Sequence, residues 1–191
     1  MSKTILYFHG FKSSSDSGKA QEFKNYIENH LSQINIVIPD LDDDFKKANE
    51  QIKNLINENE PNIFFMGSSL GGYYALYFAE VYKTKSVLIN PATPPLKDFE
   101  IHLGKNENYA TGNKFTISKD DISYIRSLHH KKISHPSNHL ILLESGDEII
   151  DYTETVSYFK GSPIDIFYGG NHSYTSIKEK FIKIKHFLDI D

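Results

Sequence analysis

Residues 63–71 constrain the fold most tightly, because an apolar run from Ile63 to Met66 leads directly into a glycine–serine–serine–leucine–glycine stretch. This G-x-S-x-G pattern behind a strand is typical of a sharp strand-to-helix turn. Backbone segments approach closely in such a turn, so Gly67 and Gly71 stand where side chains would clash. We expect the apex, Ser69, to be strained and to expose its hydroxyl as a nucleophile. An ordinary turn of small residues is the alternative, and the helical apolar spacing that follows favours the nucleophile.

Short β-rich runs alternate along the chain with stretches of helical apolar spacing. This alternation predicts βαβ units and therefore an α/β fold. Runs such as 63–66 are almost wholly apolar, as in strands that helices cover on both faces. We therefore expect a doubly wound, mostly parallel six-stranded sheet with helices on both faces. The predicted strands span 4–8, 35–38, 62–66, 86–89, 140–143 and 164–167, and the predicted helices span 17–31, 45–59, 70–82, 119–131, 152–158 and 176–188.

Composition narrows the class of function. A length of 191 residues favours one domain over residues 1–191 with a substantial core. A net charge of −4 gives no electrostatic case for a nucleic-acid partner. The absence of cysteine excludes disulfides, thiolate metal sites and a cysteine nucleophile, and it fits a cytoplasmic protein. We expect neither a cofactor nor a metal, and the oligomeric state is left open.

The residue pattern at the N-terminus does not predict a targeting signal. Met1 to Lys3 leads straight into a strand-like run, with no apolar region or cleavage site of a secretory signal. No apolar stretch in the chain approaches the ~20 residues that a membrane span requires. We therefore expect no membrane-spanning segment.

A long segment separates the predicted strands 86–89 and 140–143. It contains turn signals at Asn90-Pro91 and Pro94-Pro95 and one predicted helix. Long connections inside a domain are typically lids or binding loops. We expect residues 94–136 to form a small cap insertion over the site, with 104–112 as an ordered loop. A surface excursion without function is the alternative.

An acid and a base follow the last two predicted strands. A serine hydroxyl needs a base within hydrogen-bond reach, and the base needs a carboxylate to orient it. Behind a nucleophile of this kind the acid comes next in the chain and the histidine last. Asp147 follows the strand at 140–143 and His172 follows the strand at 164–167. We predict Ser69 as nucleophile, His172 as base and Asp147 as the orienting acid.

Glu148 and Asp151 are rival acids. Asp147 is favoured because it comes first after the strand and lies beside Gly146, which permits a tight turn. Asp151 is better placed to cap the predicted helix that begins at Tyr152.

The first predicted strand ends in His9-Gly10-Phe11. We expect His9 and Gly10 to shape a loop whose Phe11 backbone N–H pairs with that of Leu70 to form an oxyanion hole. Two such donors stabilise the charge that develops in the transition state, and losing one typically lowers turnover by ~10²–10³.

Two further patterns are set aside. His129, His130, His135 and His139 have no carboxylate or cysteine among them, so they are expected to be surface and cap residues rather than metal ligands. The stretch 13–20 resembles a phosphate-binding loop but has Ser13 where the motif requires glycine and Ala20 where it requires a hydroxyl. We expect Ser17 instead to cap the helix after it.

Several of these motifs together resemble those of the YqiA-type small bacterial esterases. They are the runs 7–14 (Tyr-Phe-His-Gly-Phe-Lys-Ser-Ser), 67–75 (Gly-Ser-Ser-Leu-Gly-Gly-Tyr-Tyr-Ala), 90–92 (Asn-Pro-Ala), 103–108, 146–148 and 170–172. The resemblance covers nearly the whole chain. It implies a compact α/β-hydrolase fold and an intracellular carboxylester hydrolase that also acts on acyl thioesters, with Ser69, Asp147 and His172 as nucleophile, acid and base.

The resulting hypothesis is a serine esterase with a small acyl ester or acyl thioester as substrate. A peptidase or acyltransferase with the same three residues is one alternative, and a non-catalytic binding protein that keeps the fold is another. Four aromatic residues near the turn, Phe11, Tyr73, Tyr74 and Tyr109, either line an acyl pocket or belong to the core.

Overall fold

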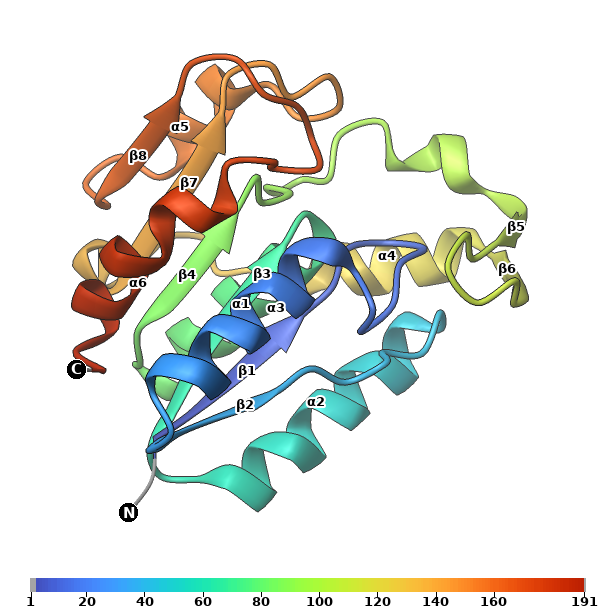
Figure 1. Ribbon diagram of the computed structural model, residues 1–191. Helices are drawn as coiled ribbons and strands as arrows, with labels where there is room; N and C mark the ends of the chain where they lie inside the picture. Colours follow the sequence, from blue (N-terminus) through green and yellow to red (C-terminus); the bar gives the residue numbers. More distant parts are fainter. Residues whose placement is uncertain (1–2, 191) are drawn as a thin grey trace.

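A parallel six-stranded sheet in the order β2-β1-β3-β4-β7-β8 forms the centre of the molecule (Figure 1). The computed structural model describes residues 3–190. Met1 and Ser2, on which the expectation about a targeting signal partly rests, lie outside the described residues. All five neighbouring strand pairs are parallel, so the predicted doubly wound sheet is confirmed. The strands are β1 (Lys3–Phe8), β2 (Ile34–Val37), β3 (Ile63–Ser68), β4 (Ser86–Ile89), β7 (His139–Glu144) and β8 (Ile164–Phe167).

The order of the strands indicates where in the sheet a ligand would bind. The chain runs from β1 outward to β2, returns to β3 on the other side of β1, and then continues outward through β4, β7 and β8. The order therefore reverses between β1 and β3, whose register pairs Phe8 with Gly67 at their carboxyl ends. Ligands of open α/β sheets bind in the crevice at such a switch point.

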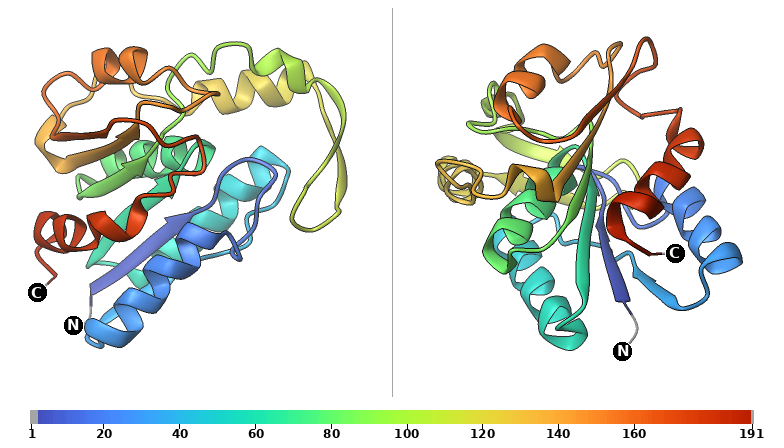
Figure 2. Two further views of the ribbon diagram at one scale, coloured as in Figure 1. Left: turned by 45° about the horizontal axis from the view of Figure 1, so that its top comes forward. Right: turned by 90° about the vertical axis from the view of Figure 1, so that its left-hand side faces the viewer.

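Helices cover both faces of the sheet (Figure 2). Alternate residues of β1 point to opposite faces: Ile5 and Tyr7 join a core with α1 and α6, whereas Leu6 and Phe8 join a core with α2, α3 and α4. The helices are α1 (Gly18–His30), α2 (Phe45–Asn59), α3 (Leu70–Tyr82), α4 (Lys119–Ser127), α5 (Tyr152–Tyr158) and α6 (Phe181–Leu188). None of the helices within residues 3–190 is long and apolar enough to cross a membrane.

Three helix ends differ from expectation. Ser17 stands at the N-cap position of α1, but its side chain makes no capping bond. Its backbone instead closes a turn, with Ser17 N–H donating to Ser14 O at 3.2 Å. Helix α4 ends at Ser127 rather than at residue 131. Beyond this end, the His130 ring forms a hydrogen bond with Tyr77 O at 3.1 Å. The last predicted helix is divided into a 3₁₀ turn, η3 (Ile177–Lys180), and α6.

The segment between β4 and β7 contains an antiparallel hairpin that the sequence did not predict. Strands β5 (Gly104–Glu107) and β6 (Lys114–Ile117) pair with Gly104 opposite Ile117, so the expected loop over 104–112 is a strand followed by a turn. The side chain of Asn108 closes that turn, because its Oδ1 accepts from Ala110 N at 3.0 Å. The hairpin projects away from the sheet (Figure 2, left).

The rest of this segment is attached to the core. Ile122 and Ile125 of α4 are buried, and Tyr73 of α3 donates from its hydroxyl to Ile125 O at 3.1 Å. Arg126 Nη2 also pairs with Glu100 at 2.8 Å, which links α4 to the 3₁₀ turn η1 (Phe99–His102). Helix α4 therefore fixes one end of the insertion, while the hairpin extends from it.

Candidate active site

The turn between β3 and α3 holds Ser69 in a strained conformation, with φ 54° and ψ −123°. Non-glycine residues adopt a positive φ of this kind mainly where surrounding contacts impose it. Here the contacts are backbone bonds: Ser69 N–H donates to Ile89 O at 3.0 Å, and Ser69 O accepts from Ala92 N at 3.0 Å. The carboxyl end of β4 thus fixes the serine from both sides.

The glycines on either side of Ser69 stand where no side chain fits. A Cβ on Gly67 would lie 2.3 Å from Gly71 O, and a Cβ on Gly71 would lie 2.1 Å from Phe8 O. Contacts this short with backbone atoms cannot be relieved by rotating a side chain. The steric reason for the G-x-S-x-G spacing is therefore the packing of α3 against β3 and β1.

His172 lies between Ser69 and Asp147. Its Nε2 is 3.0 Å from Ser69 Oγ, and its Nδ1 is 2.9 Å and 2.8 Å from the two carboxylate oxygens of Asp147. An ionised carboxylate only accepts hydrogen bonds, so Nδ1 carries the proton and Nε2 is free to accept one. The Asp147 side chain is 2% exposed and that of His172 18%, so the pair is shielded while the imidazole can still be reached.

The Asp147 carboxylate is itself held in place. Its Oδ1 accepts from Ile149 N and Ile150 N, both at 2.8 Å. These bonds fix the orientation of the carboxylate toward the imidazole.

The rival acids lie elsewhere. Glu148 contacts the backbone of His172 rather than its ring, with His172 N–H donating to Oε2 at 2.9 Å, and this bond lowers the pKa of Glu148. Asp151 caps α5 as expected, accepting from Thr153 N at 2.8 Å, and the bonds from the Thr153 side chain and backbone lower the pKa of Asp151.

His9 anchors the loop after β1. It is 7% exposed, its Nε2 accepts from Leu41 N at 3.0 Å and its Nδ1 donates to Gly10 O at 2.9 Å. Burial lowers the pKa of His9 and so favours the neutral ring, although the bond to Gly10 acts in the opposite direction. Gly10 lies against the serine, since a Cβ there would be 3.3 Å from Ser69 Cβ.

The amides of Phe11 and Leu70 flank this contact. Among the described residues neither N–H donates to another group.

A second serine–histidine–carboxylate arrangement lies at the opposite end of the sheet. Ser86 Oγ is 2.8 Å from His139 Nδ1, and His139 Nε2 is 2.8 Å from Glu80 Oε1. All three residues are buried, so no substrate reaches them.

The expectation that His139 is a surface residue is wrong, because β7 carries it into the core. His129 and His135 are exposed and His130 is half-buried. No cluster that could hold a metal is found within residues 3–190.

Two of the four aromatic residues near the turn belong to the core. Tyr73 and Tyr74 are buried, whereas Tyr109 is exposed. Phe11 is half-buried among rings from both the body and the insertion, with Phe45 of the body at 6.2 Å and Phe99 and Phe115 of the insertion at 5.4 Å and 6.0 Å between centroids. A small cavity of about 20 Å³ is lined in part by Phe11, Leu70 and Tyr74.

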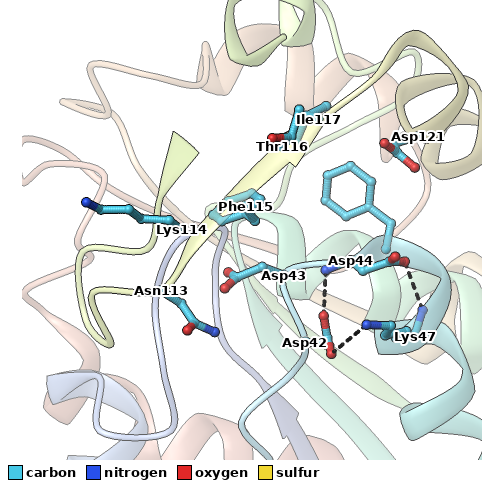
Figure 3. Close-up of a pocket in the computed structure, with 11 residues that line it drawn as sticks. Asp42, Asp43, Asp44, Lys47, Asn113, Lys114, Phe115, Thr116, Ile117 and Asp121 are labelled. Atoms are coloured by element: carbon cyan, nitrogen blue, oxygen red, sulfur yellow. Dashed lines mark hydrogen bonds and ion pairs between the residues drawn. The ribbon is translucent and has the colours of Figure 1, made fainter. Parts of the chain in front are cut away.

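A larger cavity of about 370 Å³ lies between the start of α2 and the hairpin (Figure 3). Its carboxylates already have structural partners: Asp42 accepts from Asp44 N at 2.8 Å, Asp44 caps α2, and Asp121 completes the capping box of α4. Ser69, His172 and Asp147 do not line it. The acidic cavity is therefore separate from the candidate active site.

Comparison with solved structures identifies the fold. The mouse α/β hydrolase domain-containing protein 10 superposes with a TM-score of 0.73 at 18% identity, covering 97% of this chain and 89% of that chain. Est1E from Butyrivibrio proteoclasticus, solved with ferulic acid bound, superposes with a TM-score of 0.71 at 16% identity, covering 97% and 88%. The protein therefore has the α/β-hydrolase fold.

Sequence comparison gives the family. The model of the uncharacterised protein family UPF0227 matches residues 4–189. A UPF0227 protein of Vibrio parahaemolyticus is 24% identical over 186 residues, covering 96% of this chain and 94% of the relative. The chain belongs to UPF0227, and the resemblance to the YqiA-type proteins that the motifs predicted is confirmed.

Proposed function

We propose that this protein is a serine hydrolase that cleaves small carboxylic esters, and acyl thioesters as well, through an acyl-enzyme intermediate. One observation carries the proposal: the His172 imidazole bridges Ser69 Oγ at 3.0 Å and the Asp147 carboxylate at 2.8 Å. The Nδ1–H tautomer that Asp147 imposes leaves Nε2 as an acceptor aimed at the hydroxyl. A hydroxyl so placed is activated as a nucleophile.

In the first half-reaction Ser69 Oγ bonds to the substrate carbonyl carbon while its proton passes to His172 Nε2. The imidazolium is stabilised by the buried Asp147 carboxylate. The carbonyl oxygen becomes an oxyanion, to which the Phe11 and Leu70 amides donate. The intermediate collapses as the C–O or C–S bond breaks, and His172 returns the proton to the departing alcohol or thiol.

In the second half-reaction water replaces the alcohol. His172 Nε2 takes a proton from the water, whose oxygen bonds to the acyl carbon of the ester on Ser69. The same amides hold the second oxyanion. Collapse breaks the bond to Ser69 Oγ, which recovers its proton from His172, and releases the carboxylic acid.

We also propose that the chain is one hydrolase domain in which residues 94–136 form a cap. Phe115 of the hairpin packs on Phe11, whose own amide is a proposed oxyanion donor, so the insertion contacts the site directly. The buried residues of α4 anchor the cap to the body.

A fluorophosphonate probe tests the nucleophile. The parent protein is expected to be labelled in a time-dependent manner, and Ser69→Ala is expected to remain unlabelled. Ser68→Ala is the matched control, because Ser68 precedes the apex within β3 and should leave labelling intact. Equal labelling of the parent and Ser69→Ala would refute the assignment.

A substrate panel tests the reaction class. Hydrolysis of p-nitrophenyl acetate and of a butyryl thioester is expected, with no cleavage of peptide p-nitroanilides. Peptide cleavage, or acyl transfer to an added alcohol in preference to water, would favour the alternatives with the same three residues. A folded parent protein that turns over none of the esters would favour a binding role.

A further inference from the structure

The segment that carries His172 has no regular secondary structure. It connects β8 to η3 over residues 168–176, as turns and irregular backbone. The position of the imidazole therefore depends on what holds this backbone rather than on a helix or a strand. Side chains from three other parts of the chain bond to it.

Glu144, the last residue of β7, makes the most extensive contact. Its Oε2 accepts from Asn171 N at 2.7 Å and its Oε1 accepts from Ser176 N at 2.8 Å, one amide on each side of His172. The side chain is fully buried, at 0% exposure. Gly170 makes room for it, since a Cβ there would lie 2.0 Å from Glu144 Oε2.

Asn90 connects Glu144 to the same backbone from the end of β4. Its Oδ1 accepts from Glu144 N at 2.9 Å, and its Nδ2 donates to Asn171 O at 3.1 Å. Asn90 is 1% exposed and has a φ of 39°, so it too is held in a strained conformation. The two buried side chains form a connected polar network, and such networks fix a single arrangement when every member is satisfied.

Lys19 of α1 also bonds to this segment. Its Nζ donates to Ser173 O at 3.0 Å, next to His172. Burial lowers the pKa of Lys19 to about 8, against the opposing effects of Asp147 and Glu144. This lysine belongs to the stretch that resembled a phosphate-binding loop, and its contact is with the histidine segment instead.

We propose that Glu144 is a positioning residue, whose carboxylate sets the path of residues 170–176 and thereby the placement of His172 between Ser69 and Asp147. The inference rests on the proposed function. A buried carboxylate is costly to keep unless it is fully hydrogen-bonded, and here the two bonded amides belong to the segment that holds the imidazole. Misplacing a reacting group by ~1 Å can lower the rate ~10²-fold.

The test compares two isosteric substitutions, Glu144→Gln and Glu80→Gln. Glutamine at 144 keeps one acceptor but turns an NH₂ group toward the other backbone N–H. Glu80 is a matched control, because it is also buried and also accepts from two loop amides, Ser134 N and His135 N, away from the site. Both variants are expected to unfold at lower urea concentration than the parent.

The kinetic outcomes separate the two variants. With p-nitrophenyl acetate, kcat of Glu144→Gln is expected to fall ~10²-fold with KM nearly unchanged, whereas kcat of Glu80→Gln should match the parent. A folded Glu144→Gln variant with parental kcat would overturn the positioning role. So would an equal loss of kcat in Glu80→Gln, which would reveal general destabilisation only.

A spectroscopic readout separates this inference from the proposed function. In the parent the His172 Nδ1 proton, bonded to Asp147, should give a downfield proton signal that His172→Gln abolishes. In Glu144→Gln the signal is expected to shift or vanish, and in Glu80→Gln to persist. An inactive parent whose signal nonetheless depends on Glu144 would refute the hydrolase proposal alone. An active parent whose signal and kcat both survive Glu144→Gln would refute positioning alone.

Discussion

Replacing Asp147 by asparagine should invert the tautomer of His172. Asp147 Oδ1 accepts from Ile149 N and Ile150 N, both at 2.8 Å. Asparagine can satisfy these two donors only with its own carbonyl oxygen, which leaves its NH₂ group facing His172 Nδ1. Because this NH₂ group replaces Oδ2, at 2.8 Å from Nδ1, it favours an imidazole that accepts at Nδ1 and carries its proton on Nε2, where the proton meets the Ser69 hydroxyl. A ring in this state cannot take the proton of the nucleophile.

The size of the effect follows from this change. A triad with the wrong tautomer loses a factor of ~10⁴ in kcat, equivalent to about 5 kcal/mol of transition-state stabilisation. The bonds to the two loop amides are retained, so the protein should stay folded. The assay is kcat for p-nitrophenyl acetate, with the urea midpoint measured in parallel.

Glu148→Gln is the matched control. Glu148 is the adjacent carboxylate and bonds the His172 backbone at 2.9 Å, and glutamine keeps an acceptor oxygen for that bond. Its kcat is expected within about tenfold of the parent, the scale of one ordinary hydrogen bond. A kcat for Asp147→Asn within tenfold of the parent would refute the reasoning, as would an equal loss in Glu148→Gln.

Two further predictions concern stability. Gly71→Ala should lower the free energy of unfolding by roughly 1–3 kcal/mol, since its Cβ would lie 2.1 Å from Phe8 O. Gly18→Ala, which meets nothing within 4 Å at the start of α1, should leave it unchanged or raise it, and urea titrations that ranked the two the other way would contradict the packing argument. Stability should also fall on acidification below about pH 6.5, the usual pKa of histidine, because burial lowers the folded-state pKa of His9 and of His139. In that range the unfolded chain binds protons that the folded chain does not, so ΔG of unfolding decreases as pH falls. His139→Gln should flatten this dependence above the carboxylate range, and an unchanged slope would argue against a neutral buried His139.

The sheet could be predicted from the sequence because its strands are nearly continuous apolar runs. The predicted strand ends lie within a few residues of the observed ones. At β3, for example, the observed strand continues through Gly67 and Ser68. The hairpin β5–β6 could not be predicted in this way. Its strands include Lys105, Asn106 and Glu107, which have low strand propensity. The contact of Phe115 with Phe11 is a tertiary interaction that the local sequence does not reveal.

Some residues of the candidate site could be predicted from the sequence and others could not. Ser69, Asp147 and His172 could be predicted to meet because parallel strands bring their carboxyl ends to one edge. Glu144 and His139 could not be placed, because one directly follows the predicted strand 140–143 and the other looks like part of a polar histidine cluster. Their roles depend on tertiary partners, Asn171 and Glu80, that lie far away along the chain.

Direct detection of the acyl-enzyme tests the central claim. The parent protein would be mixed with p-nitrophenyl acetate, quenched in acid within the first turnover, digested and analysed by mass spectrometry. An acetyl group on Ser69, absent from Ser69→Ala, is the predicted result. Steady turnover with no acetyl group on Ser69, or with the adduct on another residue, would contradict the account.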